Sequence, residues 1–490
     1  MFDLNFIAEP GIQTESSEAS WSFLQRSTEP ETKSAPKSSV EESKKSGANW
    51  KYYNIAASII IIILINFKKE LSLLIDNLNS VKVKNLHKVI NFGIGDFGSQ
   101  TLLSFKNSIH PERLNHLLVD FIDSEKNSSD STESTSNDST ESTSNDLTES
   151  TSNDLTESTS NDSNYYLIDE DYNSNINTWS EFENTFSEFD KFEDKIRRVG
   201  INNNIDEQTA IITGSIGETL VSGLTLPLIK KIKHINPKSS RIVLASLPSD
   251  NDTDQVQFNA YCGISRLVKN QKTSGDMLIV LQGNALNKMI GIDRSGKKLG
   301  YEILVPRILS LLTSNGHAIN NLGKMAKSLK VLAFSPVYVY GRSYEIYDNL
   351  KNILDDAAFF PLSPFQYESI ILSIVVIRVP ESVLNIVSAK RLENDYNAWN
   401  RKRFPSLKES LIQIVPVKEN SDRLDVLLLL GGAKLENIVE TVKPGYDRFK
   451  EYIRELDLWN EFQISEDDLK KLENTITTYD RNLNKLLKSN

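Results

Sequence analysis

Short apolar runs recur at regular intervals through the middle of the chain, and segments with helical spacing separate them. The runs that predict strands cover residues 89–92, 117–121, 210–212, 242–244 and 277–281. Helical spacing follows at residues 222–234 and 259–270, and a helix-like stretch ends near Arg198. Continuous apolar runs of this length are typical of strands buried on both faces of a parallel sheet. The alternation predicts an α/β fold with a doubly wound parallel sheet, whose ligands bind at the carboxyl ends of the strands.

A second α/β region follows a long helical stretch around residues 301–314. Its apolar runs predict strands near residues 332–339, 370–379, 411–417 and 424–430. Pro416 and Asn420 punctuate the last two runs, and turn-forming residues at such positions favour an antiparallel hairpin. The pattern therefore predicts a second α/β domain that ends near residue 435.

The last segment of the chain carries a heptad-like pattern. Ser465 followed by Asp468 resembles a helix start, and apolar residues then recur at alternating spacings of three and four. These residues are Leu469, Leu472, Ile476, Tyr479, Leu483 and Leu486. The helix either docks on its own domain, which its short length favours, or pairs in a coiled coil.

The first 87 residues differ in composition from the rest of the chain. Residues 1–49 are rich in Ser, Glu, Lys and Pro and predict a disordered segment, and residues 68–87 predict a linker or helix. Residues 50–67 are mostly apolar, with aromatic residues at one end and Lys68 and Lys69 after the other. That pattern favours a single membrane anchor over a buried strand or helix. The two lysines favour a cytoplasmic location for the large domain.

An acidic low-complexity segment accounts for most of the net charge. Residues 127–163 contain four tandem octads related to Ser-Thr-Glu-Ser-Thr-Ser-Asn-Asp and predict a flexible insertion in the first α/β region. The chain of 490 residues has a formal net charge of −11, and this segment holds nine acidic residues and no basic ones, so the rest totals −2. Because no basic stripe is present, nucleic acid is not an expected partner.

The cysteine and the histidines do not predict a disulfide, a nucleophile or a metal site. Cys262 is the only cysteine, so an intrachain disulfide is excluded, and a small buried apolar side chain is favoured over a nucleophile. The five histidines lack the spacing of a metal site, so no metal ligand is predicted among them.

Two glycine-bearing stretches stand where a predicted strand turns into a predicted helix. One covers residues 95–100 and the other covers residues 214–223. A glycine turn at a helix N-terminus presents backbone N–H groups and the positive end of the helix dipole, which suits a phosphate. In the second stretch, however, Glu218 places a carboxylate where the phosphate would lie.

The ordered series of motifs in residues 88–435 resembles the tubulin/FtsZ superfamily, in particular divergent archaeal FtsZ/CetZ-like or tubulin-like proteins. Residues 95–100, Gly-Asp-Phe-Gly-Ser-Gln, are similar to the first tubulin phosphate loop, Gly-Gln-Cys-Gly-Asn-Gln. Residues 210–223 resemble the strand and glycine-rich second phosphate loop. Asn259 at the opening of a helix, residues 277–286 and residues 320–336 resemble later family segments in the same order.

The resemblance implies a domain organisation and a nucleotide site. It implies a GTPase-like nucleotide domain at residues 88–300, a central helix and following loop at 301–324, a second domain at 325–435 and a helical tail at 436–490. It also implies head-to-tail self-association, or assembly with another tubulin/FtsZ-like subunit, and binding of GTP or GDP with Mg²⁺. The residues that match the family's nucleotide contacts are Gly95, Asp96, Phe97, Gly98, Ser99, Gln100, Gly217, Ser222, Gly223, Asn284 and Tyr301.

Two positions depart from the family pattern in charge. Glu218 replaces a glycine of the second phosphate loop, and Lys324 stands where the next subunit of the family supplies a catalytic acid. Two like charges about 4 Å apart cost about 4 kcal/mol at an effective dielectric constant of about 20, which lowers affinity by roughly three orders of magnitude. No catalytic residue is therefore predicted, and the expected GTP hydrolysis is weak or absent.

Three functions are compatible with these observations. The first is a membrane-tethered cytoskeletal or scaffold protein with a degenerate GTP site. The second is a GTP-binding, polymerising GTPase, and the third is a structural module that binds a partner through its C-terminal helix. Binding of GTP would separate the first two, and deletion of residues 465–490 would test the third.

Overall fold

The computed structural model describes residues 88–108, 115–121, 165–168, 176–186, 189–201, 208–269, 275–289, 301–314 and 316–488. All of them belong to one compact unit, Asn77–Asn490. The predicted segments 1–49, 50–67, 68–87 and 127–163 lie outside the described residues. Within the described ranges, no helix combines the length and the apolar character needed to cross a membrane.

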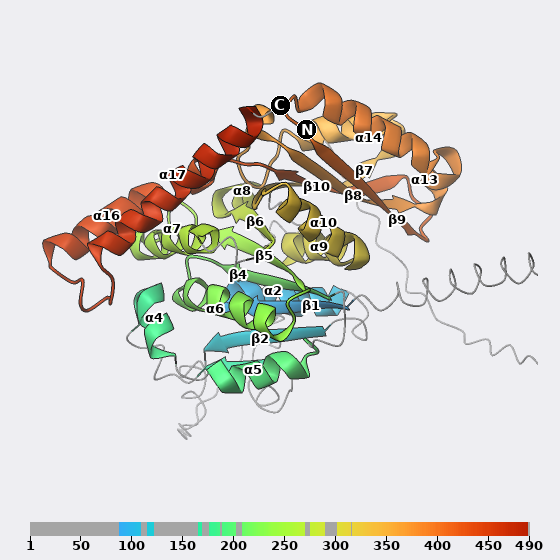
Figure 1. The fold of residues 1–490 in the computed structure, drawn as a ribbon. Coiled ribbons are helices and arrows are strands. Elements are labelled where there is room, and N and C mark those ends of the chain that lie inside the picture. Colours follow the sequence, from blue (N-terminus) through green and yellow to red (C-terminus); the bar gives the residue numbers. More distant parts are fainter. Residues whose placement is uncertain are drawn as a thin grey trace, which may run out of the picture. The chain divides into compact units, whose positions relative to one another are not determined.

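Ten strands of the described chain form one sheet, in the order β3-β2-β1-β4-β5-β6-β7-β10-β8-β9 (Figure 1). The strands are β1 (Lys88–Ile94), β2 (Asn115–Phe121), β3 (Tyr165–Ile168), β4 (Gln208–Ser215), β5 (Ser240–Leu247), β6 (Met277–Gln282), β7 (Ala333–Ser343), β8 (Leu372–Pro380), β9 (Glu409–Val417) and β10 (Arg423–Gly431). Every neighbouring pair from β3 to β7 is parallel. β4, β5 and β6 are buried along almost their whole length, which confirms the parallel sheet that their apolar runs predicted.

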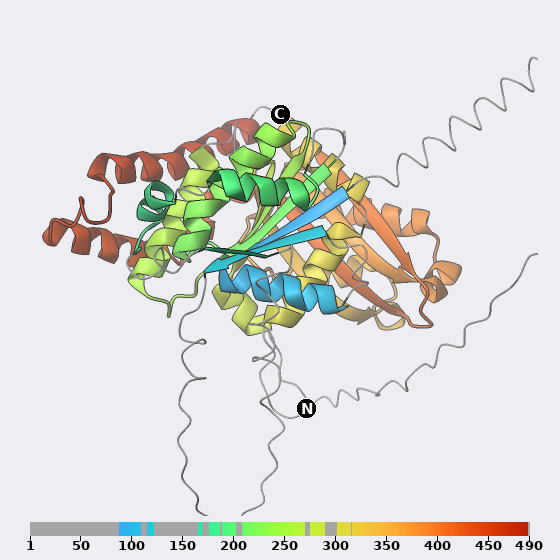
Figure 2. The ribbon, with the colours of Figure 1, turned by 90° about the horizontal axis from the view of Figure 1, so that it is seen from below.

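Helices cover both faces of the parallel half of the sheet. On one side the chain passes from β1 through α2 to β2. On the other side it passes from β4 through α6 to β5, and then through α7 to β6. Because such crossovers are right-handed, α2 lies on one face together with α9, and α6 and α7 lie on the other (Figure 2). The helices of this half are α2 (Gly95–Ser108), α4 (Trp179–Thr185), α5 (Phe189–Arg198), α6 (Thr219–Ile235), α7 (Asp254–Lys269), α8 (Gly283–Met289), α9 (Tyr301–Thr313) and α10 (Gly316–Ser328).

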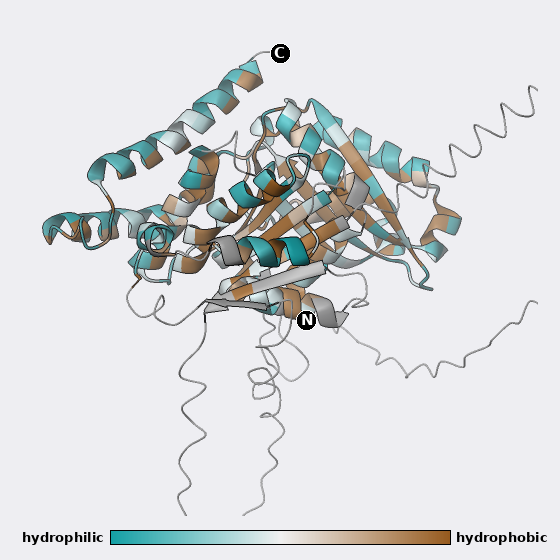
Figure 3. Ribbon diagram, turned by 60° about the horizontal axis from the view of Figure 1, so that its bottom comes forward, coloured by the Kyte–Doolittle hydropathy of each residue, from teal (hydrophilic) through white to brown (hydrophobic). Residues whose placement is uncertain are grey.

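The second half of the sheet has a core of its own, between β7, β8 and β10 and the helices α12 and α14. Only two residue pairs, Leu278 with Ala333 and Ile279 with Phe334, join β6 to β7. Apolar residues follow the central strands, and the outward sides of the helices are polar (Figure 3). The helices are α11 (Tyr344–Tyr347), α12 (Leu350–Ala357), α13 (Glu381–Ile386), α14 (Ala389–Arg403), α15 (Leu435–Val439), α16 (Lys443–Glu455) and α17 (Glu466–Lys488), with a short 3₁₀ turn η3 (Tyr367–Ser369).

The predicted hairpin between the last two strands is wrong. β9 pairs with β8 in parallel, and β10 lies between β7 and β8 and is antiparallel to both. The burial of the strands explains this order. All residues of β10 after Arg423 are buried, so the backbone N–H and C=O groups on both of its edges need hydrogen-bond partners, which β7 and β8 supply. β9 is only half-buried and contains Pro416, which cannot donate a ladder hydrogen bond and is tolerated at the edge of a sheet.

The segment after the central helix also differs from its prediction. Residues 301–324 were expected to hold the central helix and the loop after it, but residues 316–324 form most of a second helix, α10. Ile319, Leu322 and Ala326 are buried at helical spacing, so this segment gains a packed apolar stripe by folding as a helix.

The C-terminal helix docks on its own domain, as its length suggested. In α17, Leu469, Leu472, Ile476, Tyr479 and Leu483 are all buried. The Tyr479 hydroxyl also accepts hydrogen bonds from the backbone N–H groups of Leu332 and Ala333, at 3.3 and 3.1 Å. The helix is therefore tied to the start of β7, and its apolar seam is covered within the same chain.

Candidate functional site

The turns that follow β1, β4, β5 and β6 lie along one edge of the sheet. These four strands are neighbours and run parallel, so their carboxyl ends meet. The turns lie at Gly95, at residues 216–218, at residues 248–253 and at Gly283. This edge brings together the predicted residues at the start of α2, Gly217 and Asn284, as expected for ligand binding in such a sheet.

The first turn keeps the backbone that a phosphate site needs. Gly95 has a φ of +69°, in the left-handed region that glycine adopts without strain, and it opens α2 directly. Gly98 packs so closely on the Thr213 carbonyl of β4 that a Cβ atom there would collide with it. Phe97 and Ser99 are buried, whereas Asp96 and Gln100 are exposed. The glycines therefore serve the strand-to-helix packing as well as the open turn.

The Glu218 carboxylate lies against the first turn. Glu218 is the N-cap residue of α6, but its side chain makes no capping hydrogen bond. A Cβ atom added to Gly95 would collide with Glu218 Oε2, which places the carboxylate directly beside the Gly95 backbone. The space between the two glycine turns is thus occupied by a negatively charged side chain of the protein.

Of the three residues predicted in the second phosphate loop, only Gly217 lies in the turn. Ser222 and Gly223 lie in the first turns of α6, within the packing layer between α4, α6 and α7. The Ser222 hydroxyl donates to the Thr219 carbonyl at 3.2 Å, and its own carbonyl accepts from Arg266 at 2.8 Å. Gly223 packs on the ring of Phe182, where a Cβ atom would collide with the ring. Both residues have a packing role at these positions.

Tyr301, one of the residues that match the family's nucleotide contacts, stacks on another ring of the protein. The rings of Tyr301 and Phe97 lie 4.6 Å apart between centroids, with planes inclined by 29°. The Tyr301 hydroxyl also donates to Gln100 Oε1 at 2.9 Å. Tyr301, Phe97 and Gln100 therefore lie together and form a closed contact between α2 and α9. A base could enter only by parting these two rings.

Asn284 lies on the far side of the same edge. It belongs to the first turn of α8, and its Oδ1 atom accepts a hydrogen bond from the backbone N–H of Asp250 at 3.4 Å. Asp250 and Asp252 in this turn are exposed, and together with Asp96 and Glu218 they make the edge acidic. Such a charge repels a nucleotide triphosphate.

A segment near the site was not identified from the sequence. The Asn177 carbonyl, just before α4, accepts hydrogen bonds from Gln255 at 2.8 Å and Asn259 at 3.0 Å. Asn259 was predicted to open its helix, but α7 begins at Asp254, and Asn259 is buried within it. The reason is local, because the Thr253 hydroxyl accepts from the Val256 N–H at 3.4 Å and starts the helix earlier. The run of polar residues at 249–254 is the sequence feature that could have indicated this earlier start of the helix.

The remaining chemistry-bearing residues lie away from the turns. Cys262 is completely buried in α7, and burial raises the pKa of its thiol to about 12, so the interpretation as a buried apolar side chain is confirmed. Lys324 is exposed on α10, next to Gly323, which packs on Ser240 at the amino end of β5. It therefore lies at the end of the sheet opposite to the turns. Among the described residues, no cluster of His, Cys, Asp and Glu could hold a metal ion.

Comparisons with known proteins identify the fold. No family model and no curated protein matches this sequence. Among solved structures, CetZ from Methanosaeta thermophila superposes with a TM-score of 0.54 at 13% identity, over 79% of this chain and 99% of that one. CetZ1 from Haloferax volcanii, solved as a GDP-bound monomer, gives a TM-score of 0.54 at 14% identity, over 74% of this chain and 99% of that one. With the sheet order and the two glycine turns, these similarities show that this chain has the tubulin/FtsZ superfamily fold.

Proposed function

We propose that this chain is a membrane-tethered tubulin/FtsZ-like cytoskeletal or scaffold protein with a degenerate GTP site and weak or no GTP hydrolysis. The observation that carries the proposal is the Glu218 carboxylate beside Gly95, between the two glycine turns. It supplies negative charge and side-chain volume at the place where the fold would otherwise offer backbone N–H groups to a phosphate. The residues present therefore do not fit a nucleotide triphosphate.

Two further observations support a site that does not turn over GTP. The Tyr301 and Phe97 rings stack on each other, at 4.6 Å between centroids, so the position for a base is closed. Lys324 replaces the acid that the family resemblance implies, and an ammonium group cannot polarise water as a carboxylate does. Each change acts against a different part of the reaction: phosphate binding, base binding and water activation.

A titration of the full chain with a fluorescent GTP analogue and Mg²⁺ tests this proposal. We expect no saturable binding at micromolar concentrations, because the Glu218 carboxylate repels the phosphates. Saturable micromolar binding, with assembly that depends on the nucleotide, would contradict the degenerate site and support a polymerising GTPase. That second function is favoured by one observation, the left-handed backbone of Gly95 at the N-terminus of α2. GDP or GTP with Mg²⁺ would then be the cofactor.

The membrane tether is tested separately by fractionation. Residues 50–67 are mostly apolar and are followed by two lysines, so we expect the full chain to sediment with membranes. Deletion of residues 1–69 should release the remainder into the soluble fraction. A matched deletion of residues 1–46 removes the polar N-terminal segment alone and should leave the chain with the membranes. Membrane association of the chain without residues 1–69 would contradict the tether.

The third function, a module that pairs through its C-terminal helix, finds no support. The seam of α17 that would have to meet a partner is buried against the same chain. The Asp480 carboxylate accepts hydrogen bonds from the Leu435 and Glu436 N–H groups at 2.8 and 2.9 Å, which fixes α17 further. Exposing the seam would require breaking these contacts.

A further inference from the structure

A pocket of about 700 Å³ lies between α7, α15, α16 and α17. α7 packs against both α16 and α17, which lie beside it (Figure 1). None of the residues that line the pocket belongs to the two glycine turns. A pocket of this volume is typical of sites that bind small molecules.

Two contacts hold α15 in place as one wall of the pocket. The Gln282 side chain, at the end of β6, donates a hydrogen bond to the Ile438 carbonyl at 3.0 Å. The Asp480 carboxylate of α17 accepts hydrogen bonds from the Leu435 and Glu436 N–H groups at the start of the helix. The wall is therefore fixed before a ligand arrives, which lowers the entropic cost of binding.

The floor of the pocket is aromatic and aliphatic. Tyr261, Val439 and Ile476 line it, and all three side chains are buried. The ring of Tyr261 already lies near one cation, because Lys443 Nζ is 5.7 Å from the ring centroid. An ammonium group on a chain of methylene groups matches such a floor, since the ring suits the charge and the aliphatic side chains suit the methylene groups.

The hydroxyl of Tyr261 is available to a ligand. The side chain is only 3% exposed and lines the pocket, and its hydroxyl makes no hydrogen bond with the described residues. Burial raises the pKa of Tyr261, and the charges of Glu473, Asp447 and Glu436 raise it further. Asp447 and Glu436 also line the pocket. A buried hydroxyl without a partner is unfavourable, so a ligand that bonds to it gains affinity.

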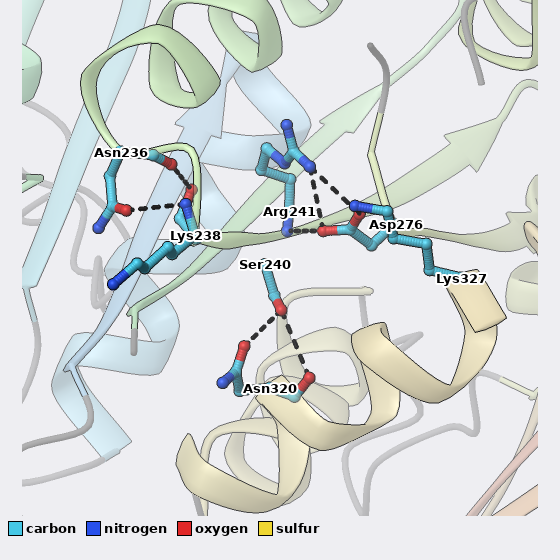
Figure 4. Close-up of polar contacts among 8 residues, drawn as sticks. Asn236, Lys238, Ser240, Arg241, Asp276, Asn320 and Lys327 are labelled. Atoms are coloured by element: carbon cyan, nitrogen blue, oxygen red, sulfur yellow. Dashed lines mark hydrogen bonds and ion pairs between the residues drawn. The ribbon is translucent and has the colours of Figure 1, made fainter. Parts of the chain in front are cut away.

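Two carboxylates at the rim of the pocket are unpaired. Glu436 and Glu440 are exposed, line the pocket, and form no ion pair with the described residues. Asp276, directly before β6, shows the contrasting case, because it pairs with Arg241 at 3.2 Å and lies 3.9 Å from Lys327 Nζ (Figure 4). Like charges four residues apart on a helix disfavour each other, so Glu436 and Glu440 would be stabilised by a cation.

The charged side chains that line the pocket leave a net negative charge. Glu436, Glu440 and Asp447 supply three carboxylates, and Lys443, which pairs with Asp447, supplies one ammonium group, so the sum is −2. Among the described residues, no group of His, Cys, Asp and Glu could hold a metal ion. The charge and the apolar floor together suit an organic cation with more than one positive charge.

We propose that this pocket binds an aliphatic diamine or polyamine. Its ammonium groups contact Glu436 and Glu440, and its methylene groups lie over Val439 and Ile476. The Tyr261 hydroxyl accepts a hydrogen bond from one ammonium group, and the face of the ring attracts the same charge. The site goes beyond the proposed function and does not depend on it, because the glycine turns contribute no residue to the pocket.

Isothermal titration calorimetry of the full chain in a mild detergent tests the proposal, with 1,5-diaminopentane and spermidine as probes. We expect saturable binding of one molecule per chain, with a Kd below about 1 mM. 1-Aminopentane has only one ammonium group, so it should bind at least about tenfold more weakly than the diamine. Binding without a defined stoichiometry, or equal displacement by Mg²⁺ at the concentration of the diamine, would identify a non-specific counterion and overturn the proposal.

Variants of the pocket should change the affinity for 1,5-diaminopentane in both directions. Glu436→Gln combined with Glu440→Gln removes the two unpaired carboxylates and should weaken binding at least about tenfold. Tyr261→Phe keeps the ring and should weaken binding about threefold, because it removes one hydrogen bond. Lys443→Gln should strengthen binding about threefold, because it frees Asp447 and removes a competing ammonium group. Loss of affinity in Lys443→Gln, with the variant folded by circular dichroism, would contradict a cation site.

A matched control removes two carboxylates outside the pocket. Glu455 and Glu461 are exposed and do not line it, so Glu455→Gln combined with Glu461→Gln should keep the affinity within about twofold of the native value. If this control loses as much affinity as the pocket variant, the net charge and not the pocket is responsible, and the inference fails. The absence of saturable binding by the native chain would also overturn the inference, while the proposed function would stand.

Discussion

Replacing Glu218 with glycine is expected to raise the affinity of the full chain for a fluorescent GTP analogue with Mg²⁺ by up to about three orders of magnitude. The native carboxylate lies beside the Gly95 backbone, where a phosphate would approach. Two like charges about 4 Å apart cost about 4 kcal/mol at an effective dielectric constant of about 20, and each 1.4 kcal/mol is a factor of about ten. A fluorescence titration of the native and variant chains measures this difference.

A Glu218→Gln variant separates charge from volume in this experiment. It keeps the size of the side chain and removes its charge. Equal gains in the Gln and Gly variants would identify charge as the cause, and a gain in the Gly variant alone would identify the space beside Gly95. If neither variant binds, the carboxylate is not what limits binding. The stacked rings of Tyr301 and Phe97 are then the next structural cause to test.

Replacing Asp276 with alanine is expected to lower the free energy of unfolding by about 3–5 kcal/mol. Asp276 is the ion-pair partner of Arg241, whose side chain is only 2% exposed. Among the described residues, Arg241 Nε and Nη1 have no hydrogen-bond partner, so the carboxylate alone offsets the cost of burying this charge. Removing one partner of a buried pair leaves the other uncompensated, which accounts for the size of the effect.

Urea unfolding followed by circular dichroism measures this loss, and a double variant is the control. Asp276→Ala combined with Arg241→Met removes both charges and keeps an apolar side chain of similar length. It should recover most of the lost stability, because replacing a buried pair by apolar residues is often neutral. A loss below about 1 kcal/mol in Asp276→Ala would show that solvent or another group compensates Arg241.

The sequence predicts the parallel half of this fold because its signal there is local. Residues 210–212, 242–244 and 277–281 are apolar on both faces, and that property alone indicates a strand covered by two helix layers. The order of β8, β9 and β10 is not local. The polar residues between 417 and 423 mark a turn, but they do not encode whether the strands they join become neighbours. The burial of β10 decides the order of these strands, and this burial cannot be read from the sequence around residues 417–423 alone.

In the candidate site, too, the sequence predicts one side-chain feature and fails to predict others. The conflict at Glu218 follows from the sequence, because a carboxylate at a phosphate turn is unfavourable wherever the surrounding atoms lie. The places of Ser222 and Gly223 do not follow, because the family resemblance assumes a loop that extends to residue 223. Here α6 begins at Thr219, which draws both residues into the helix. A motif match predicts which residues correspond to the family's ligand contacts. The residue at which the helix begins determines which of them lie in the turn.

The central position of β10 has a consequence for how the protein is made. β7 and β8 both pair with β10, and residues 423–431 leave the ribosome long after β7 and β8 have been synthesised. Until then, both earlier strands present unpaired hydrogen-bonding edges and apolar faces, which favour aggregation. A nascent chain that stops before Arg423 therefore cannot close the second half of its sheet, so that half can fold only after residues 423–431 have been synthesised.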